Sequence, residues 1–435
     1  MKFTQDEILK TGAQLVRGGF DGEAAISTDT RTIQKGDLYL PLKGENFNGE
    51  DFIKDALDKG AVGVLQAQDS LIVYLKLANY ARKKINPKVV AITGSSGKTT
   101  TKEMIAAVLS QKFKTHKTFA NHNNEVGLCQ TILSMPEDTQ VLILEMGMRG
   151  LGEIEMLSKY AEPDIAVITN IGTAHIGRLG SIENIAKAKC EIVKHLRPNG
   201  ILIARKDDEL ILKRHCEEHS DEAIQPLGNF ISWIASLPLV ARNDINYSKF
   251  LYKEKEYELN AAGDYNIENA IAAIETGFQL GMTYDEIRRG LLTYKPIEKR
   301  WETVEVGDFR IINDSYNANP ESMKAAVQTF IDLYENPLVV LGDMGELGEM
   351  EEELHRAVGR ELNGTAKFIT VGKLAACIGE ELAKRGFSVK SFDTNLEAAR
   401  YILAHCDVSA TILLKASRTM KFEEIIEVLR GENRK

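Results

Sequence analysis

Short apolar runs alternate with stretches of helical periodicity along most of the chain. In the middle part the runs occupy residues 89–93, 141–147, 164–172 and 200–204. A second series, in which a polar or glycine-rich turn follows each run, occupies residues 309–320, 337–348, 367–372 and 410–417. Such alternation predicts mainly parallel sheets with helices on both faces, and ligands at the carboxyl ends of the strands.

The same pattern divides the chain into three α/β units, as a length of 435 residues allows. The predicted units are residues 1–86, 87–298 and 299–435. In the first, β-type runs at 37–41 and 61–65 surround a helical stretch at 51–59. Residues 83–88 are predicted to form its exit linker.

The stretch 214–244 differs in style from the rest of the chain. It gathers prolines, glycine, a tryptophan and two histidines, and it resembles the translation of a palindromic repeat inserted into a reading frame. We therefore expect a surface insertion, which a folded domain tolerates at a loop. His215, Cys216 and His219 could mimic a metal cluster, but no fourth ligand with zinc-site spacing follows.

Composition narrows the function classes. The net charge of −9 argues against a broad nucleic-acid interface, which needs a basic surface. No stretch reaches the roughly 18 consecutive apolar residues of a membrane span, and the first residues lack an apolar core, so we expect a cytoplasmic protein. We also expect a monomer. The five cysteines are scattered without a C-x-x-C pair, which favours free thiols over disulfides or a zinc site.

A glycine-rich turn ending in Lys98 carries the strongest chemical signal. It follows an apolar β-branched run and precedes a helix-forming stretch. Gly94 and Gly97 let backbone N–H groups face phosphate oxygens, Lys98 supplies positive charge, and Thr99 or Thr100 offers a hydroxyl to Mg²⁺. These features predict a nucleoside triphosphate site.

This turn is shorter than the generic phosphate loop. The generic pattern has glycine six residues before the lysine, where this chain has Ile92, so the form present is G-x-x-G-K-T-T. A glycine-rich turn without a ligand is the alternative interpretation. The strand before it and the helix after it favour the phosphate loop.

Polar residues at other strand ends extend this candidate site. Asn121, Asn123 and Asn124 lie in a turn-rich loop suited to a polar substrate, although the loop by itself could be only a turn. Glu145 ends an apolar strand, where a carboxylate is expected to meet metal or solvent. His175 follows the next strand end and is predicted to contact metal or phosphate, although a lone histidine is more often an ordinary residue.

A predicted helix follows, with Ser181 as its N-cap. Its two lysines, Lys187 and Lys189, would by default be solvated.

Six segments together resemble the Mur ligase family in order and spacing: TGSSGKTTTKEM, NHNNEVGL, LEMGMRGLGEI, TAHIGRLGSIENIAKAKCEI, NDSYNANPESMKAA and VLGDMGELGEMEEELH. The likeness also includes STDTRTIQKGDLYLPLKGENFNGEDF and LLKASRTMKFEEI, and thus covers nearly the whole chain outside the stretch after Lys213. It implies a small N-terminal α/β domain, a central P-loop ATPase domain with a mainly parallel sheet, and a C-terminal Rossmann-like α/β domain.

The resemblance also implies roles for individual residues. ATP would be bound by Gly94, Ser95, Ser96, Gly97, Lys98, Thr99, Thr100, Asn266, Asn269, Arg300 and Asp314. Mg²⁺, as two ions, would be held by Thr99, Glu145, His175 and a carbamylated Lys189. The implied catalytic residues are Lys98, Lys189, His175, Arg300 and Asp314.

Substrate contacts follow in the same way. A uridine nucleotide would be held by Ser27, Thr28, Asp29, Arg31, Lys43 and Gly44. Asn121, Asn123 and Asn124 would lie near the phosphates, and Tyr316, Asn317 and Asn319 near an incoming dipeptide. The chain departs from the family with Tyr265, Gly177 and Ala416 where histidine, glutamate and glycine are usual.

The implied activity is ATP-dependent addition of D-Ala-D-Ala to UDP-N-acetylmuramoyl-tripeptide through an acyl phosphate, a step of peptidoglycan precursor synthesis. Three alternatives stay open: a sister ligase that adds the third amino acid, a folylpolyglutamate synthase-like ligase, and a nucleotide-binding regulator that has lost the chemistry. The sister enzyme's D-N-P-R motif is absent, and SYNANP stands in its place.

Overall fold

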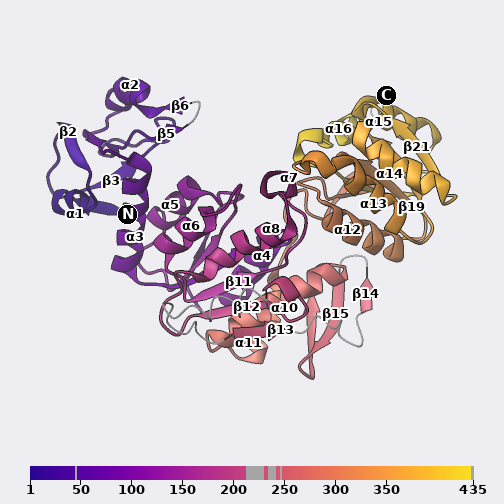
Figure 1. Cartoon of the computed structure of the whole chain (residues 1–435), viewed down its shortest axis with the longest axis horizontal. Helices are drawn as coiled ribbons and strands as arrows, with labels where there is room; N and C mark the ends of the chain where they lie inside the picture. Colours follow the sequence, from indigo (N-terminus) through magenta and orange to yellow (C-terminus); the bar gives the residue numbers. More distant parts are fainter. Residues whose placement is uncertain (45–46, 212–229, 234–241, 245–246, 433–435) are drawn as a thin grey trace.

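The computed structural model describes residues 1–44, 47–211, 230–233, 242–244 and 247–432. Three α/β bodies follow one another, with the N-terminal and C-terminal bodies at opposite ends of the central one (Figure 1). The predicted three-part α/β architecture is therefore confirmed.

The N-terminal body is a small mixed sheet of order β1-β3-β4-β7-β2. Its elements are β1 (Lys2–Thr4), α1 (Gln5–Lys10), β2 (Gln14–Gly18), β3 (Glu23–Ser27), β4 (Leu38–Tyr39), α2 (Ile53–Asp58) and β7 (Gly63–Gln66), with a separate hairpin of β5 (Lys43–Gly44) and β6 (Phe47–Asn48). The runs expected at 37–41 and 61–65 and the helix expected at 51–59 are all present.

Helix α3 (Ser70–Ile85) joins this body to the centre by packing on α5 and α6. Its Asn79 amide donates to Tyr160 O at 2.8 Å, and its buried Arg82 pairs with Glu162. The linker predicted at 83–88 is wrong in extent, because the helix continues to Ile85 and ends at a left-handed Asn86. Among the described residues no helix is long and apolar enough to cross a membrane.

The central sheet has the order β13-β12-β11-β8-β10-β9, and all its described pairs are parallel. Its strands are β8 (Lys88–Thr93), β9 (Thr115–Lys117), β10 (Val141–Glu145), β11 (Ile165–Ile168), β12 (Ile201–Arg205) and β13 (Phe230–Trp233). Alternate residues of β8 enter different cores: Val90 and Ile92 face α4 and α10, while Val89 and Ala91 face α3, α5 and α6. Burial on both faces explains the continuous apolar runs.

Helices and one hairpin sheet complete the central body. The helices are α4 (Lys98–Leu109), α5 (Glu125–Leu133), α6 (Glu153–Ala161), α7 (Ile176–Leu179), α8 (Ile182–Cys190), α10 (Asp264–Gln279) and α11 (Tyr284–Thr293). The hairpin sheet comprises β14 (Arg242–Asp244), β15 (Tyr247–Tyr252) and β16 (Lys255–Leu259).

The stretch predicted to be a surface insertion, 214–244, is only partly described. Within it, β13 extends the central sheet beside β12, and β14 pairs with β15. These two segments are therefore strands of the central body, whereas residues 214–229 and 234–241, with His215, Cys216 and His219, lie outside the described residues. The sequence did not reveal the strands, because their neighbours in the sheets are set by tertiary contacts.

The C-terminal body contains a sheet of order β17-β18-β22-β19-β20-β21, parallel except for β17. Its strands are β17 (Glu302–Val306), β18 (Phe309–Asn313), β19 (Pro337–Gly342), β20 (Lys367–Val371), β21 (Ser388–Phe392) and β22 (Thr411–Lys415). Its helices are α12 (Pro320–Leu333), α13 (Glu351–Glu361), α14 (Lys373–Lys384), α15 (Asn395–His405) and α16 (Glu423–Glu432), with short 3₁₀ turns η3 (Gly348–Met350) and η4 (Arg418–Met420). The residues that contact the central body lie just before β17, after β18 and after β19.

Candidate active site between the central and C-terminal domains

The phosphate loop connects β8 to α4 in a conformation that requires its two glycines. Gly94 and Gly97 have φ values of 151° and 79°. A Cβ at Gly97 would lie 2.5 Å from Asn269 Oδ1, and one at Gly94 would lie 1.8 Å from Thr169 Oγ1. Any side chain there would displace the loop, so the glycine requirement inferred from the sequence is borne out.

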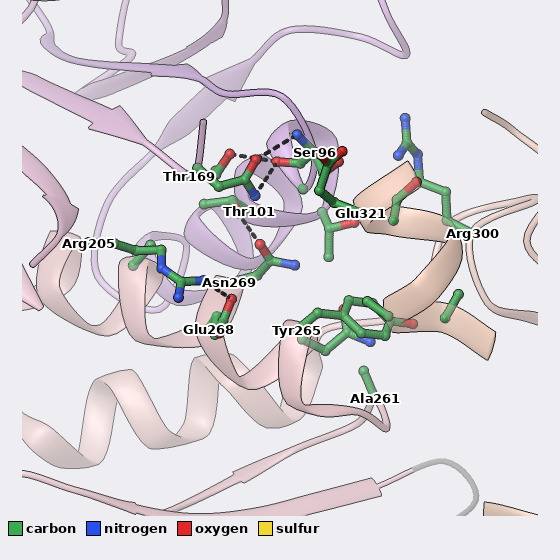
Figure 2. Close-up of a pocket in the computed structure, with 18 of the residues that line it drawn as sticks. Ser96, Thr101, Thr169, Arg205, Ala261, Tyr265, Glu268, Asn269, Arg300 and Glu321 are labelled. Atoms are coloured by element: carbon green, nitrogen blue, oxygen red, sulfur yellow. Dashed lines mark hydrogen bonds and ion pairs between the residues drawn. The ribbon is translucent and has the colours of Figure 1, made fainter. Parts of the chain in front are cut away.

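The end of β11 holds this loop from the side. Thr169 Oγ1 donates to Ser96 O at 2.5 Å, and Asn170 Oδ1 accepts from Ser96 N at 3.0 Å (Figure 2). Ser95 Oγ donates to Gly172 O at 3.0 Å. Sequence reasoning missed Thr169 and Asn170, although their position directly after an adjacent apolar strand was the available signal.

Lys98 folds back onto the loop and donates to Gly94 O at 2.7 Å. Burial lowers the pKa of its amine, while the nearby Glu145 carboxylate opposes that shift. A desolvated cation with only a carbonyl partner is well placed to bind an anion.

Glu145 is buried at the end of β10, next to the loop. Its Oε1 accepts from Thr99 Oγ1 at 3.2 Å and from Asn123 Nδ2 at 2.9 Å. Its Oε2 has no hydrogen-bond partner and lies 3.6 Å from Nζ of the fully buried Lys102. A carboxylate oxygen left open beside a threonine hydroxyl suits Mg²⁺, which prefers oxygen ligands. No pattern in the sequence pointed to Lys102.

His175 pairs with the C-terminal domain rather than with Glu145. It has a left-handed backbone before α7, and its Nδ1 lies 2.6 Å from the Glu346 carboxylate of the C-terminal domain, which lowers the pKa of that carboxyl. In the part of the chain that the structure describes, no three His, Cys, Asp or Glu residues are grouped to hold a metal. The implied joint coordination is therefore not formed here, because His175 turns toward the other domain.

Lys189 is 1% exposed near the end of α8, so its interpretation as a solvated helix lysine is wrong. Lys187, on the same helix, is exposed as expected, and Ser181 caps the helix by accepting from Asn184 N at 3.2 Å. Burial, assisted by repulsion from Lys98, holds the pKa of the Lys189 amine well below its ordinary value. This shift favours the neutral, nucleophilic form of the amine.

A cavity of about 640 Å³ opens on one side of the loop, within the size range of small-molecule sites. Asn266 and Asn269 of α10 line it as predicted, and Asn269 Oδ1 accepts from Thr101 Oγ1 at 3.0 Å. Tyr265 and Trp301 meet edge to face in its wall, with ring centres 6.1 Å apart. The departure at Tyr265 thus places an aromatic wall where the family usually has a histidine.

An ion pair that the sequence did not reveal closes the far end of this cavity. Arg205, at the end of β12, donates to Glu268 on α10 at 2.6 Å (Figure 2). Arg205 also pairs with Asp207 at 2.8 Å. These groups are polar partners available to a ligand's hydroxyl or amine groups.

The C-terminal domain contacts both the phosphate loop and the segment that follows β11. Arg300 Nη2 donates to Thr99 Oγ1 at 3.1 Å, and Asn319 Nδ2 donates to Ser96 Oγ at 2.9 Å. Thr173 Oγ1 donates to Glu321 at 2.9 Å, and Gly177 N donates to Glu346 O at 3.1 Å. The implied role of Arg300 at the phosphate loop agrees with this geometry, whereas Glu321 and Glu346 were missed.

Asp314 does not touch the loop directly. Its carboxylate accepts from the buried Lys415 at 2.7 Å, and Lys415 also donates to Asn317 O at 3.0 Å. The pair lines both the 640 Å³ cavity, called the nucleotide-sized cavity below, and a second cavity. Ala416, the departure beside Lys415, is buried in the C-terminal core.

The second cavity, of about 450 Å³, adjoins the first at the loop, where Ser96 and Gly97 line both. Residues from both domains line it, including Ser95, Lys98, Thr99, Asn121, Asn123, Glu145, His175, Tyr316, Asn317 and Asn319. Asn124 instead caps α5 by accepting from Gly127 N at 3.0 Å, and Asn319 also caps α12. Most of the residues predicted for metal and acceptor therefore meet in this cavity.

The residues predicted for the uridine nucleotide lie apart from both cavities, on the N-terminal domain. Asp29 pairs with Arg31 at 2.6 Å, an interaction that lowers the pKa of the Asp29 carboxyl. Lys43 pairs with Glu50 at 3.2 Å, and Gly44 lies in the β5–β6 hairpin. The structure groups these residues on one domain.

A glycine–glycine contact sets the distance between the C-terminal domain and α7. A Cβ on Gly177 would lie 2.4 Å from Gly348 N and 2.8 Å from Leu347 C. The glutamate usual in the family at position 177 would not fit this arrangement.

We expect Gly177→Ala to lower kcat by roughly 10- to 100-fold with little change in Tm, because a displacement of about 1 Å suffices to misplace catalytic groups. The matched control is Gly431→Ala on α16, where a Cβ meets no atom within 4 Å. Wild-type turnover by Gly177→Ala would show that the contact is irrelevant to catalysis.

Comparison with known proteins agrees with this geometry. Three family descriptions match: Mur ligase family, catalytic domain, at residues 24–112; Mur ligase middle domain at 92–277; and Mur ligase, glutamate ligase domain, at 299–418. The UDP-N-acetylmuramoyl-tripeptide–D-alanyl-D-alanine ligases of Bacillus subtilis and Escherichia coli are 36% and 31% identical, each over 93% of this chain and 92% and 93% of their own lengths.

Solved structures show the same similarity. MurF from Acinetobacter baumannii superposes with a TM-score of 0.90 at 29% identity, covering 99% of each chain. MurF ligase from Thermotoga maritima in complex with ADP gives a TM-score of 0.82 at 26% identity, covering 94% of this chain and 98% of that one. The chain belongs to the Mur ligase family.

Proposed function

We propose that the protein is an ATP-dependent ligase that joins D-Ala-D-Ala to UDP-N-acetylmuramoyl-tripeptide by an amide bond, a step of peptidoglycan precursor synthesis. The observation that carries this is the second cavity, in which Lys98, Thr99 and Glu145 face Tyr316 and Asn317 of the C-terminal domain. The names of the relatives in Bacillus subtilis and Escherichia coli support the choice of substrates.

The reaction must convert an unreactive carboxylate into an acylating agent. The terminal carboxylate of the tripeptide attacks the γ-phosphorus of ATP, giving an acyl phosphate and ADP. The dipeptide amine then attacks the acyl carbon, loses a proton, and phosphate leaves as the amide forms. Lys98 and the loop N–H groups stabilise the charge on the transferring phosphoryl group, and Arg300 approaches it from the other domain.

Each domain takes one substrate in this scheme. The domain at 1–86, with Ser27, Asp29 and Arg31, holds the uridine nucleotide, and the domain at 87–298 holds ATP in the larger cavity. The domain at 299–435 supplies Tyr316, Asn317 and Asn319 to the dipeptide. Contact between the last two domains excludes water from the acyl phosphate.

Thr99 Oγ1 and the open Oε2 of Glu145 fit Mg²⁺. When bound, the ion neutralises charge on the phosphates. Asn123 holds Oε1 of this carboxylate, and the Lys102 amine lies 3.6 Å from Oε2. His175 would join this set only after leaving Glu346.

We infer further that Lys189 carries a carbamate. A neutral buried amine attacks CO₂ and loses a proton, which converts the side chain into an anion. That anion removes the repulsion between Lys189 and Lys98 and supplies oxygen ligands for a second Mg²⁺.

Phosphate release with each substrate omitted in turn tests the function. We expect release to require ATP, UDP-N-acetylmuramoyl-tripeptide and D-Ala-D-Ala together, with single D-alanine failing as acceptor, because a site that pairs with both ends of a dipeptide rejects analogues lacking one. Faster release with UDP-N-acetylmuramoyl-dipeptide and a single amino acid would assign the chain to a sister reaction.

A further inference from the structure

The second cavity contains two cations that the reaction scheme leaves without a task, Arg149 and Arg418. Each of its other cations has a polar partner: Lys98 donates to Gly94 O, Arg300 to Thr99, and Lys415 to Asp314. Among the described residues, no carboxylate forms an ion pair with the Arg418 side chain. A cation facing a substrate cavity without a counter-ion is a candidate anion site.

Arg418 belongs to the C-terminal domain, on the short turn η4 after β22. Its guanidinium carbon lies 5.4 Å from the centre of the Tyr316 ring, and that of Arg300 lies 4.2 Å from the same centre. Glu423, further along the chain, pairs with Lys299 at 3.1 Å. The Tyr316 ring therefore orients Arg418 through a cation–π contact. The N–H donors along the edge of the guanidinium stay available.

The acceptor is the substrate that needs such a group. D-Ala-D-Ala carries a free carboxylate, and bidentate pairing with arginine is the strongest recognition of a carboxylate available to a protein. Arg418 lines the second cavity and not the nucleotide-sized one, whereas Arg300 lines both. Arg418 is therefore placed for the acceptor rather than for ATP.

The acceptor dipeptide is a short molecule, so the group that binds its carboxylate must lie close to the phosphate loop. Consecutive Cα atoms are about 3.8 Å apart, so the amine and the terminal carboxylate of a dipeptide are separated by roughly 6 Å. Arg300, which contacts the phosphate loop through Thr99, and Arg418 both lie against the ring of Tyr316. A carboxylate on Arg418 would leave the amine directed toward the acyl phosphate beside the loop.

We propose that Arg418 is the binding residue for the terminal carboxylate of the acceptor dipeptide, with Tyr316 as its positioning residue. This inference rests on the proposed function and names the specificity determinant of its acceptor site. It explains selection of a dipeptide over a single amino acid as a matter of the distance between Arg418 and the reacting centre.

The test compares D-Ala-D-Ala with its C-terminal amide in wild type, Arg418→Met, Arg418→Lys and the control Arg400→Met, an exposed arginine on α15 of the same domain. Wild type should prefer the acid by about 10-fold or more in kcat/KM, the size of effect expected for losing a hydrogen bond to a charged group on the exposed Arg418. In Arg418→Met we expect KM for D-Ala-D-Ala to rise by a similar factor and the acid-to-amide ratio to fall to about 1, with KM for ATP changed less than about 3-fold. Arg418→Lys should be intermediate, because it keeps charge without the bidentate geometry.

The outcomes separate this inference from the proposed function. If wild type does not ligate D-Ala-D-Ala, the proposed function fails. If wild type does and Arg418→Met still discriminates acid from amide, the carboxylate binds elsewhere and the inference is overturned. A rise in KM for the UDP-linked substrate alone would overturn it as well, by moving Arg418 to the donor. Thermal unfolding of each variant shows that the exposed substitutions leave the fold intact.

Discussion

Lys98→Ala is expected to reduce ligation by at least about a hundredfold, equivalent to roughly 3 kcal/mol of transition-state stabilisation. The amine is the side-chain cation of the phosphate loop, and among the described residues its hydrogen-bond acceptor is Gly94 O. Removing it leaves the transferring phosphoryl group without that charge. Steady-state phosphate release at saturating substrates measures the effect.

The fold should survive this change. Burial lowers the pKa of the Lys98 amine, which means that the folded protein gains nothing from holding it charged, so Tm should be unchanged or slightly higher. Lys76→Ala, an exposed lysine on α3, serves as the control and should keep full activity. More than a tenth of wild-type turnover in Lys98→Ala would contradict the assignment of this turn as a phosphate loop.

Lys189→Ala is expected to lose activity by about two orders of magnitude and to regain part of it in concentrated acetate or formate. Loss of the carbamate removes oxygen ligands from the site, and a small carboxylate that enters the vacated space replaces them. A purely structural lysine would show no such response. The measurement is turnover with increasing acetate at constant ionic strength.

Two controls separate the carbamate from simple packing. Lys187→Ala changes an exposed lysine on the same helix and should be active and insensitive to acetate. Carbon-13 NMR of the wild-type protein with labelled CO₂ should show a carbamate signal that is missing in Lys189→Ala. Full activity of Lys189→Ala without additive would remove the residue from the site, and rescue without a carbamate signal in the wild type would contradict the modification.

The strands and the phosphate loop were predictable because their signals are local. Val141–Glu145 and Ile165–Ile168 are buried on both faces, so each reads as a continuous apolar run. The turn at Gly94 and Gly97 requires positive φ angles, and glycine is the residue type that adopts them most readily. The edge strands Ser388–Phe392 and Lys255–Leu259 are only partly buried and carry polar residues, and they gave no such run.

Only the tertiary structure decided how distant segments complete the site. Lys187 and Lys189 look alike in the sequence of one helix. Lys189 is buried and Lys187 is exposed, and this difference depends on how α8 packs within the central domain. His175 meets Glu346, and Gly177 meets Gly348, across segments about 170 residues apart, so no local pattern encodes them.

The sequence by itself therefore determined the three α/β units, the phosphate loop and the carboxylate at Glu145, each of which depends on residues close together in the chain. The partners of those groups were decided by folding. Thr99 is bonded by Arg300, and Asp314 by Lys415, through contacts that span about 200 and 100 residues. Contact between domains, rather than the spacing of residues along the chain, fixes which charges face the substrates and which are neutralised.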